Sequence, residues 1–168
     1  MKIGILSDTH GELPLPVRRF LEPCAHLCHA GDIGGLPLLD ELSAFKPLTA
    51  VFGNIDDWAV RRTCPQTAVF SIESCKVLMT HIGGYPGRYA PGIPSLLERE
   101  KPDLFIAGHS HILKIMPDTK RGFLYINPGA AGCKGFHSRI TAVRLDVEGK
   151  KFSNLEVFDW ERSAYVRS

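Results

Sequence analysis

The chain has 168 residues, of which 44% are hydrophobic and 23% are charged, a composition typical of an ordinary globular domain. Lys and Arg number 20 and Asp and Glu 18, which gives a formal charge of +2 and argues against a dedicated nucleic-acid-binding surface. The longest apolar stretches, residues 3–6 and 104–107, are far shorter than the ~18 residues that cross a bilayer, so no membrane span is expected. We expect a single domain over residues 1–168, because domains typically run about 100 to 200 residues.

The N-terminus and the cysteines both favour the cytosol. The chain starts with Met-Lys and a β-prone run, and Asp8 and His10 interrupt that run before it can serve as a secretory signal. Five scattered cysteines, an odd number, favour reduced thiols over a disulfide framework. We therefore expect a cytoplasmic protein.

The first half of the chain alternates strands and helices. Residues 2–7 form a short apolar run that stops abruptly at polar residues, as a buried strand that ends at a site would. Apolar residues at helical spacing predict a helix over 13–23, with its prolines near the start, where helices tolerate them. Strands are expected at 25–29 and 48–52, separated by a helix at 36–45. This order favours a sheet with helices packed on it.

The second half is richer in strands. Residues 68–72 and 76–80 are typical of a hairpin, and residues 93–101 of a helix with a proline in its first turn. Further strands are expected at residues 104–107, 113–116, 123–126, 140–147 and 152–158. The sequence thus predicts an α/β sandwich of two mixed sheets flanked by helices, partly parallel in the first half and antiparallel in the second.

Potential metal ligands follow each strand that is expected to be buried. The carboxyl ends of strands are where open α/β sheets place their sites, because the strand fixes position while the loop can bend. Carboxylate, amide and imidazole groups without sulfur suit Zn, Fe, Mn or Ni. Seven such groups exceed one tetrahedral site and fit two adjacent ions that share a carboxylate. The seven residues are Asp8, His10, Asp32, Asn54, His81, His109 and His111.

Taken singly, several of these residues have an ordinary structural interpretation. Asp8 and Asp32 are also suited to cap helices, and His81 at a strand end is also suited to a structural hydrogen bond. The Gly-His-Ser-His segment is harder to explain in this way, since His109 and His111 alternate to one side of an extended backbone. The joint occurrence of all seven residues favours the dimetal interpretation.

The order of these blocks resembles that of a known family. Asp8-x-His10, Gly31-Asp32, Gly53-Asn54-x-Asp56, His81 and Gly108-His-Ser-His111, followed by Asn127-Pro-Gly129, resemble the calcineurin-like metallophosphoesterases, and among them the small single-domain phosphodiesterases. The resemblance covers the chain from residue 2 to about residue 158.

The resemblance implies two divalent metal ions and a role for each ligand. Asp8, His10, Asp32 and His111 would hold one ion, and Asp32, Asn54, His81 and His109 the other, with Asp32 bridging. Asp32, Asn54 and His81 would then be the catalytic residues. A hydroxide between the ions would attack the phosphorus in line, because coordination lowers the pKa of bound water to ~7. We expect Mn, while Ni, Fe and Zn are also suited to the ligand set.

One residue departs from the pattern of the larger phosphatases of this superfamily. They carry a His directly after the Asn of the third block, where it protonates the leaving group, and this chain has Ile55 there. General acid catalysis is commonly worth ~10²- to 10⁴-fold, so its absence favours phosphodiesters with good leaving groups over alkyl monoesters. The expected substrate is a small phosphodiester. Two alternatives stay open: a protein-binding scaffold resembling the retromer sorting subunit, and a phosphomonoesterase or nucleotidase.

Other residues near the expected site have undecided roles. Asp56 can orient a metal ligand by a hydrogen bond without binding the metal itself. The Asn127-Pro-Gly segment either packs under the ligands or forms a plain turn. His137 and Arg139 lie in a loop near the expected mouth of the site, where they either touch substrate or are solvated. Residues 85–89 form either a substrate-selecting flap or a surface loop. Without a cap domain the pocket should be shallow and its specificity loose, and association into homo-oligomers stays open.

The Cys24 to His29 segment mimics a metal motif without matching one. Its two cysteines are separated by three residues, no second pair follows, and residues 24, 26 and 28 would share one strand face. We expect these cysteines to pack as small apolar groups. Cys75 and Cys133 have no fixed His partner and are expected to be structural.

Overall fold

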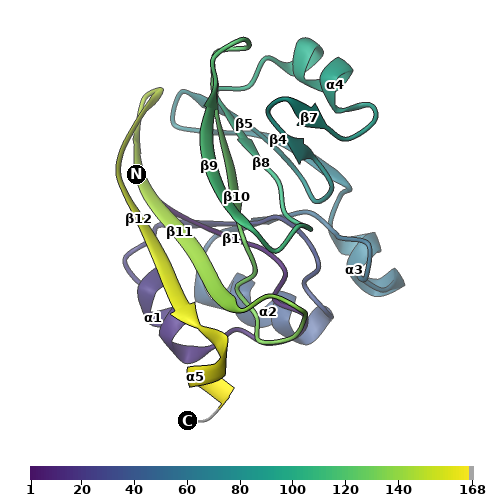
Figure 1. The fold of residues 1–168 in the computed structure, drawn as a ribbon, viewed down its shortest axis with the longest axis vertical. Coiled ribbons are helices and arrows are strands. Elements are labelled where there is room, and N and C mark those ends of the chain that lie inside the picture. Colours follow the sequence, from purple (N-terminus) through teal and green to yellow (C-terminus); the bar gives the residue numbers. More distant parts are fainter. Residues whose placement is uncertain (167–168) are drawn as a thin grey trace.

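The computed structural model describes residues 1–166, and its central feature is a pair of five-stranded sheets packed face to face (Figure 1). The first sheet has the strand order β12-β11-β1-β2-β3. Strands β1, β2 and β3 are parallel, whereas β11 runs antiparallel to both β1 and β12. These strands are β1 (Lys2–Leu6), β2 (His26–His29), β3 (Leu48–Ala50), β11 (Arg139–Glu148) and β12 (Lys151–Glu161).

The second sheet has the order β4-β5-β8-β10-β9, and a two-stranded ribbon, β6 (Gly84–Tyr85) and β7 (Arg88–Tyr89), lies beside it. Its three central strands, β5, β8 and β10, are parallel. The expectation of an antiparallel second half holds for the β4–β5, β9–β10 and β11–β12 pairs, but it was wrong for these three central strands. Helix α4 (Ile93–Glu100) carries the chain from β5 back to the start of β8, which makes these two strands parallel. The strands are β4 (Thr67–Ile72), β5 (Cys75–Thr80), β8 (Leu104–Ile106), β9 (Leu113–Asp118) and β10 (Phe123–Pro128).

Alternation of side chains along the strands creates a central core and two outer ones. In β1, Ile3 and Ile5 point into the core between the sheets, whereas Leu6 points toward the helices. Gly4 also faces the helices, and a Cβ there would lie 2.7 Å from the side chain of Leu21, so the missing side chain lets a helix pack closely on the strand.

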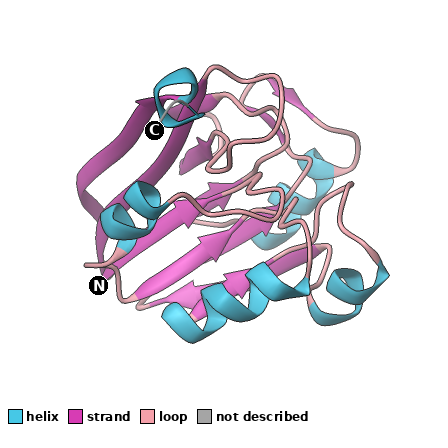
Figure 2. Ribbon diagram, turned by 90° about the horizontal axis from the view of Figure 1, so that it is seen from below, coloured by secondary structure: helices cyan, strands magenta, loops and turns pink. Residues whose placement is uncertain are grey.

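Helices cover the outer faces of both sheets (Figure 2). Four helices contribute to the core on the first sheet, and α4 with the ribbon residues Tyr85 and Tyr89 packs on the second. No helix in residues 1–166 is long and apolar enough to span a membrane. The four helices are α1 (Leu15–Leu21), α2 (Leu36–Phe45), α3 (Trp58–Thr63) and α5 (Arg162–Val166).

Several element boundaries differ from the sequence expectation. The helix expected over 13–23 is shorter, because Pro14 is its N-cap in an extended conformation and the helix begins only at Leu15. Helix α2 has the expected bounds. Helices α3 and α5 were not expected. Helix α3 has only six residues, and the carboxylate of Asp57 stabilises its start by accepting a hydrogen bond from the Val60 N–H at 3.0 Å.

Cys24 and Cys28 pack as small apolar groups, but not on one face. Strand β2 begins only at His26, so the alternation does not extend back to Cys24. Cys28 lies in the core between the sheets and Cys24 in the core beneath the helices, which corrects the expected shared face.

Candidate metal centre

The loops after the parallel strands meet at one edge of the sandwich. The backbone N–H of Asp8 donates to the Gly31 carbonyl at 3.0 Å, and the N–H of His10 donates to the Asp32 carbonyl at the same distance. From the second sheet, the N–H of Gly108 donates to the carbonyl of His81 at 2.9 Å. These backbone bonds hold together, in two pairs, the segments that carry six of the seven predicted ligands, all except Asn54.

An unusual backbone conformation turns most of these side chains inward. Asp8, His10, Asp32, His109 and His111 all have positive φ, between 49° and 69°. Left-handed backbone is uncommon for residues other than glycine and costs on the order of 1–3 kcal/mol per residue, so it persists where the surrounding structure imposes it. Each of these loops folds back immediately after its strand, and the side chains converge on a common space.

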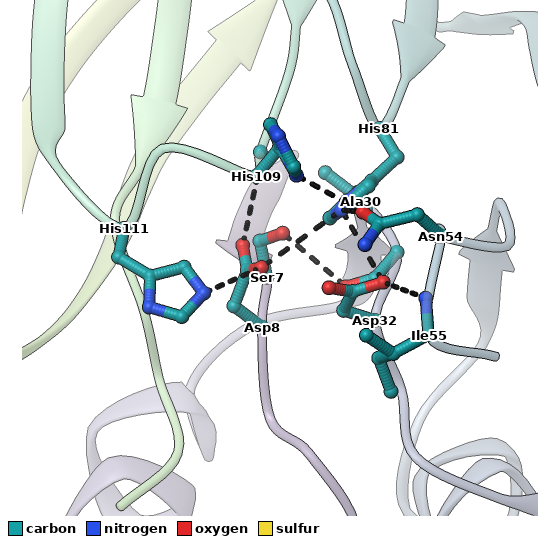
Figure 3. A network of polar contacts seen from close by, with 12 residues as sticks. Ser7, Asp8, Ala30, Asp32, Asn54, Ile55, His81, His109 and His111 are labelled. Atoms are coloured by element: carbon teal, nitrogen blue, oxygen red, sulfur yellow. Dashed lines mark hydrogen bonds and ion pairs between the residues drawn. The ribbon is translucent and has the colours of Figure 1, made fainter. Parts of the chain in front are cut away.

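Asp8, His10 and His111 form a first group of predicted ligands. Figure 3 shows Asp8 and His111 in this group. Oδ1 of Asp8 lies 3.1 Å from Nε2 of His111 and 4.0 Å from Nε2 of His10, and the two imidazole nitrogens are 3.3 Å apart. Oδ2 of Asp8 accepts a hydrogen bond from the backbone N–H of His109 at 3.1 Å, which leaves Oδ1 as the oxygen that faces the imidazoles.

The second group lies directly beside the first and is built around His81. Its Nε2 is 3.3 Å from Oδ1 of Asp32 and 3.0 Å from Oδ1 of Asn54, and Nδ1 of His109 lies 3.0 Å from the same Asn54 oxygen. Nε2 of His81 is also 4.0 Å from Oδ1 of Asp8, so the two groups adjoin. Asp32, His81 and His109 form the second cluster of the described residues that could hold a metal ion.

The chemistry of this cluster fits bound cations. Oδ1 of Asp8 is buried and accepts no well-formed hydrogen bond, although an uncompensated buried carboxylate oxygen is costly. Burial raises the pKa of Asp8, but the imidazoles of His111 and His81 lower it by more, so the pKa falls below its ordinary value. The pKa of Asp32 shifts in the same direction, since burial raises it and His81 and the Ile55 N–H lower it by more. Two ionised, buried carboxylates surrounded by imidazole nitrogens form a donor set that suits divalent transition metals.

Two residues behind the ligands hold the loops in place. The buried carboxylate of Asp56 accepts hydrogen bonds from the backbone N–H groups of Ile33, Gly34 and Gly53, at 3.1, 2.8 and 2.8 Å. It therefore ties the Asp32 loop to the Asn54 loop without touching a ligand side chain.

Asn127 does the same for the His109 to His111 segment. Its amide donates to the Gly108 carbonyl at 2.8 Å and to Oγ of Ser110 at 3.1 Å. Its Oδ1 accepts from the Gly129 N–H at 3.0 Å, so the Asn-Pro-Gly segment does pack under the ligand loop.

Comparison with known proteins agrees with this geometry. A family model described as the calcineurin-like phosphoesterase superfamily domain matches residues 1–150. The chain belongs to this superfamily. A probable metallophosphoesterase from Methanothermobacter thermautotrophicus is 31% identical over 137 residues, which cover 77% of each chain. The phosphodiesterase MJ0936 from Methanocaldococcus jannaschii is 26% identical over 175 residues, with 92% of this chain and 98% of the relative covered.

Solved structures share the fold. A single mutant of Vps29 from Entamoeba histolytica has a TM-score of 0.76 at 16% identity, with 96% of this chain and 99% of that chain covered. At this level of identity the likeness shows the fold alone.

The surface around the candidate metal centre of this phosphoesterase is partly apolar. A cavity of about 520 Å³ lies over the ligands and is also lined by Ile55, Lys134 and Phe136. Ile55 and Phe136 are both exposed there, although large apolar side chains are usually covered. Among residues 1–166, Lys134 is the one lysine or arginine that lines this cavity.

Two of the undecided segments lie beside the site. The β6–β7 ribbon is tied down, because Tyr89 donates to Asp118 at 2.6 Å and Nζ of Lys114 lies 3.6 Å from the ring centre of Tyr85. Together with His109 it lines an adjoining cavity of about 430 Å³. Arg139 lines a third cavity, and its Nε pairs with Asp159 at 2.6 Å.

His137 is the last of the residues near the site whose roles the sequence left undecided. The structure places its Nδ1 3.2 Å from Nδ1 of His111, in direct contact with a predicted ligand. Its spacing from the other blocks gives no signal of this contact, because the intervening loop has no regular periodicity.

Proposed function

We propose that this protein is a metal-dependent phosphodiesterase that holds two divalent ions, one in each ligand group. The observation that carries the proposal is the buried Oδ1 of Asp8, which accepts no hydrogen bond and faces nitrogens of His10, His81 and His111. A carboxylate oxygen and imidazole lone pairs repel one another unless a proton or a cation lies between them.

The proposed ligand assignment follows the two groups. Asp8, His10 and His111 would hold the first ion and Asn54, His81 and His109 the second, with Asp32 shared between them. The ions, Mn²⁺ in our proposal, would supply charge for the phosphoryl oxygens and an activated water. His81 is oriented for this role because its Nδ1 donates to the Ala30 carbonyl at 2.7 Å, which turns Nε2 toward Asn54 and Asp32.

The position after Asn54 supports a diester substrate. Ile55 has no side-chain proton to give, and its backbone N–H is already engaged with Asp32 at 3.0 Å. A leaving group that needs little protonation suits such a site better than an alkyl alcohol. Lys134 lines the cavity over the ligands and would contact a non-bridging phosphoryl oxygen of the substrate.

The proposal also covers the cellular compartment and the class of substrate. We place the enzyme in the cytosol, acting on a small phosphodiester rather than on nucleic acid held by a dedicated surface. A scaffold resembling Vps29 is the rival. A Vps29 from Entamoeba histolytica has been solved in complex with Zn²⁺, so metal binding alone does not separate the two functions, and the activity test below does. A phosphomonoesterase is the second rival, and the substrate comparison below separates it.

The test is hydrolysis of bis-p-nitrophenyl phosphate by protein freed of metal and then supplied with Mn²⁺ or Ni²⁺. We expect activity only with metal, and a loss of orders of magnitude in Asp32→Asn and His81→Ala. Asp40→Asn, an exposed carboxylate on α2, is the matched control and should keep full activity. Unchanged activity in the two site variants would refute the proposal, and faster hydrolysis of p-nitrophenyl phosphate than of its diester would favour a monoesterase.

A further inference from the structure

We propose that His137 is a positioning residue that fixes the ring proton of His111, and so keeps the other ring nitrogen of His111 free for a metal ion. The contact between the two rings is direct, with their centres 5.0 Å apart and their planes nearly perpendicular, at 79°. The inference rests on the proposed function only in taking His111 as a metal ligand.

The hydrogen bonds of His137 determine which of the two Nδ1 atoms, that of His137 or that of His111, donates the hydrogen bond between the rings. Its Nε2 lies 2.9 Å from the carbonyl oxygen of Gly132, and a carbonyl oxygen only accepts, so this nitrogen carries the proton. A neutral imidazole has one ring proton, which leaves Nδ1 of His137 as an acceptor. Nδ1 of His111, 3.2 Å away, must therefore donate to it.

The position of this proton determines what Nε2 of His111 can bind. With the proton held on Nδ1, Nε2 presents a lone pair to the space that it shares with Oδ1 of Asp8 and Nε2 of His10. Without His137 the proton is free to move to Nε2 and donate to the Asp8 carboxylate. That internal hydrogen bond would compete with a cation for the same two atoms.

The loop that carries His137 is held closely against the ligand. A Cβ at Gly135 would lie 2.9 Å from Nδ1 of His137 and 3.0 Å from Cε1 of His111, so the absence of a side chain there allows the contact. The guanidinium of Arg162, at the start of α5, donates to the carbonyls of Cys133 and Gly135. The C-terminal helix thus anchors the loop from the other side.

The effect should be confined to one of the two ions. The ring of His81 in the second group is oriented by the Ala30 carbonyl, independently of His137. Loss of a partner that orients a metal-ligating histidine typically costs about 10- to 100-fold in metal affinity. We therefore expect that cost for the first group and none for the second.

Calorimetric titration of metal-free protein with Mn²⁺ tests the inference without any substrate. The variants are His137→Phe, which removes both hydrogen bonds, and His137→Gln, whose amide can donate to Gly132 and accept from His111. His26→Phe, at the opposite end of β2 from the site, is the control. His137→Phe should weaken one ion by about 10- to 100-fold, His137→Gln should restore most of the affinity, and the control should bind as wild type.

Variants in which one ligand group is already disabled show which of the two ions His137 affects. In His109→Ala, which weakens the second group, adding His137→Phe should still reduce binding of the remaining ion. In His111→Ala the same addition should change nothing. If His137→Phe binds two ions with wild-type affinity, or if both ions are weakened equally, the inference about His137 is wrong and the proposed function is unaffected. Wild-type protein that binds no Mn²⁺ would overturn the proposed function as well.

Discussion

His29 lies fully buried beneath the metal centre, and we expect it to make the stability of the fold depend on pH. Its Nδ1 accepts from the Gly31 N–H at 3.2 Å, which leaves Nε2 to donate to Oγ1 of Thr9 at 2.9 Å. Thr9 in turn donates to the Ile33 carbonyl at 3.0 Å. The neutral ring therefore links the loop that carries Asp8 to the loop that carries Asp32.

Burial lowers the pKa of His29 from 6.5 to about 4, despite the opposing effect of nearby carboxylates. Between these two pH values the unfolded chain binds a proton at this ring and the folded chain does not. The free energy of unfolding must therefore fall as the pH falls from 6.5 toward 4. At ~1.4 kcal/mol per pKa unit, the full loss attributable to this side chain is about 3.5 kcal/mol.

Urea unfolding of wild-type protein and His29→Gln, each between pH 7.5 and pH 4.5 in EDTA, measures this contribution. The variant should be less stable at neutral pH, because the glutamine amide cannot match both bonds of the ring. Its stability should fall less with acidification, so that the two curves converge by about 2–3 kcal/mol. Parallel curves would refute the assignment of a buried neutral imidazole to His29.

Three further predictions concern the metal centre. A Cβ at residue 53 would lie 2.0 Å from Oδ1 of Asp32. Gly53→Ala should therefore lower the free energy of unfolding by about 1–3 kcal/mol, measured by urea unfolding, and should weaken Mn²⁺ binding, measured by calorimetry. Gly122→Ala is the control: its Cβ would meet no atom within 4 Å, and its φ of +78° makes an alanine there costly in stability, yet it should bind Mn²⁺ as wild type. Equal Mn²⁺ binding by both variants would contradict the argument. Because metal binds the folded state, Mn²⁺ at about 100 times its Kd should stabilise the protein by about 2.7 kcal/mol per site. Urea unfolding measures this gain, and EDTA should reverse it. An unfolding midpoint that Mn²⁺ does not shift would count against a formed site. Lys134→Met should raise KM for the diester more than it lowers kcat, and a pure kcat effect in steady-state assays would place Lys134 in the chemistry instead.

The convergence of the candidate ligands could be predicted because it depends on simple rules of strand direction. Asp8, Asp32 and Asn54 each follow one of three parallel strands, and the carboxyl ends of parallel strands meet at one edge. Helix α2 was equally predictable, since Gly35 stands just before it and Lys46-Pro47 just after it.

Features that depend on distant packing could not be predicted in this way. The positive φ at residues such as Asp8 and His111 is imposed by loops from both sheets, and no local pattern encodes it. The parallel direction of β8 depends on the return path through α4, and the contact between His137 and His111 depends on how a long loop lies over the site. A six-residue helix such as α3 is too short to be stable without tertiary contacts, here the burial of Val60.

The number of divalent ions bound per chain tests the central claim most directly. Metal-free wild-type protein titrated with Mn²⁺ should bind two ions, His111→Ala one in the second group, and His109→Ala one in the first. Binding of no ion by the wild-type protein, or of two ions by both variants, would contradict a dinuclear centre built from these residues.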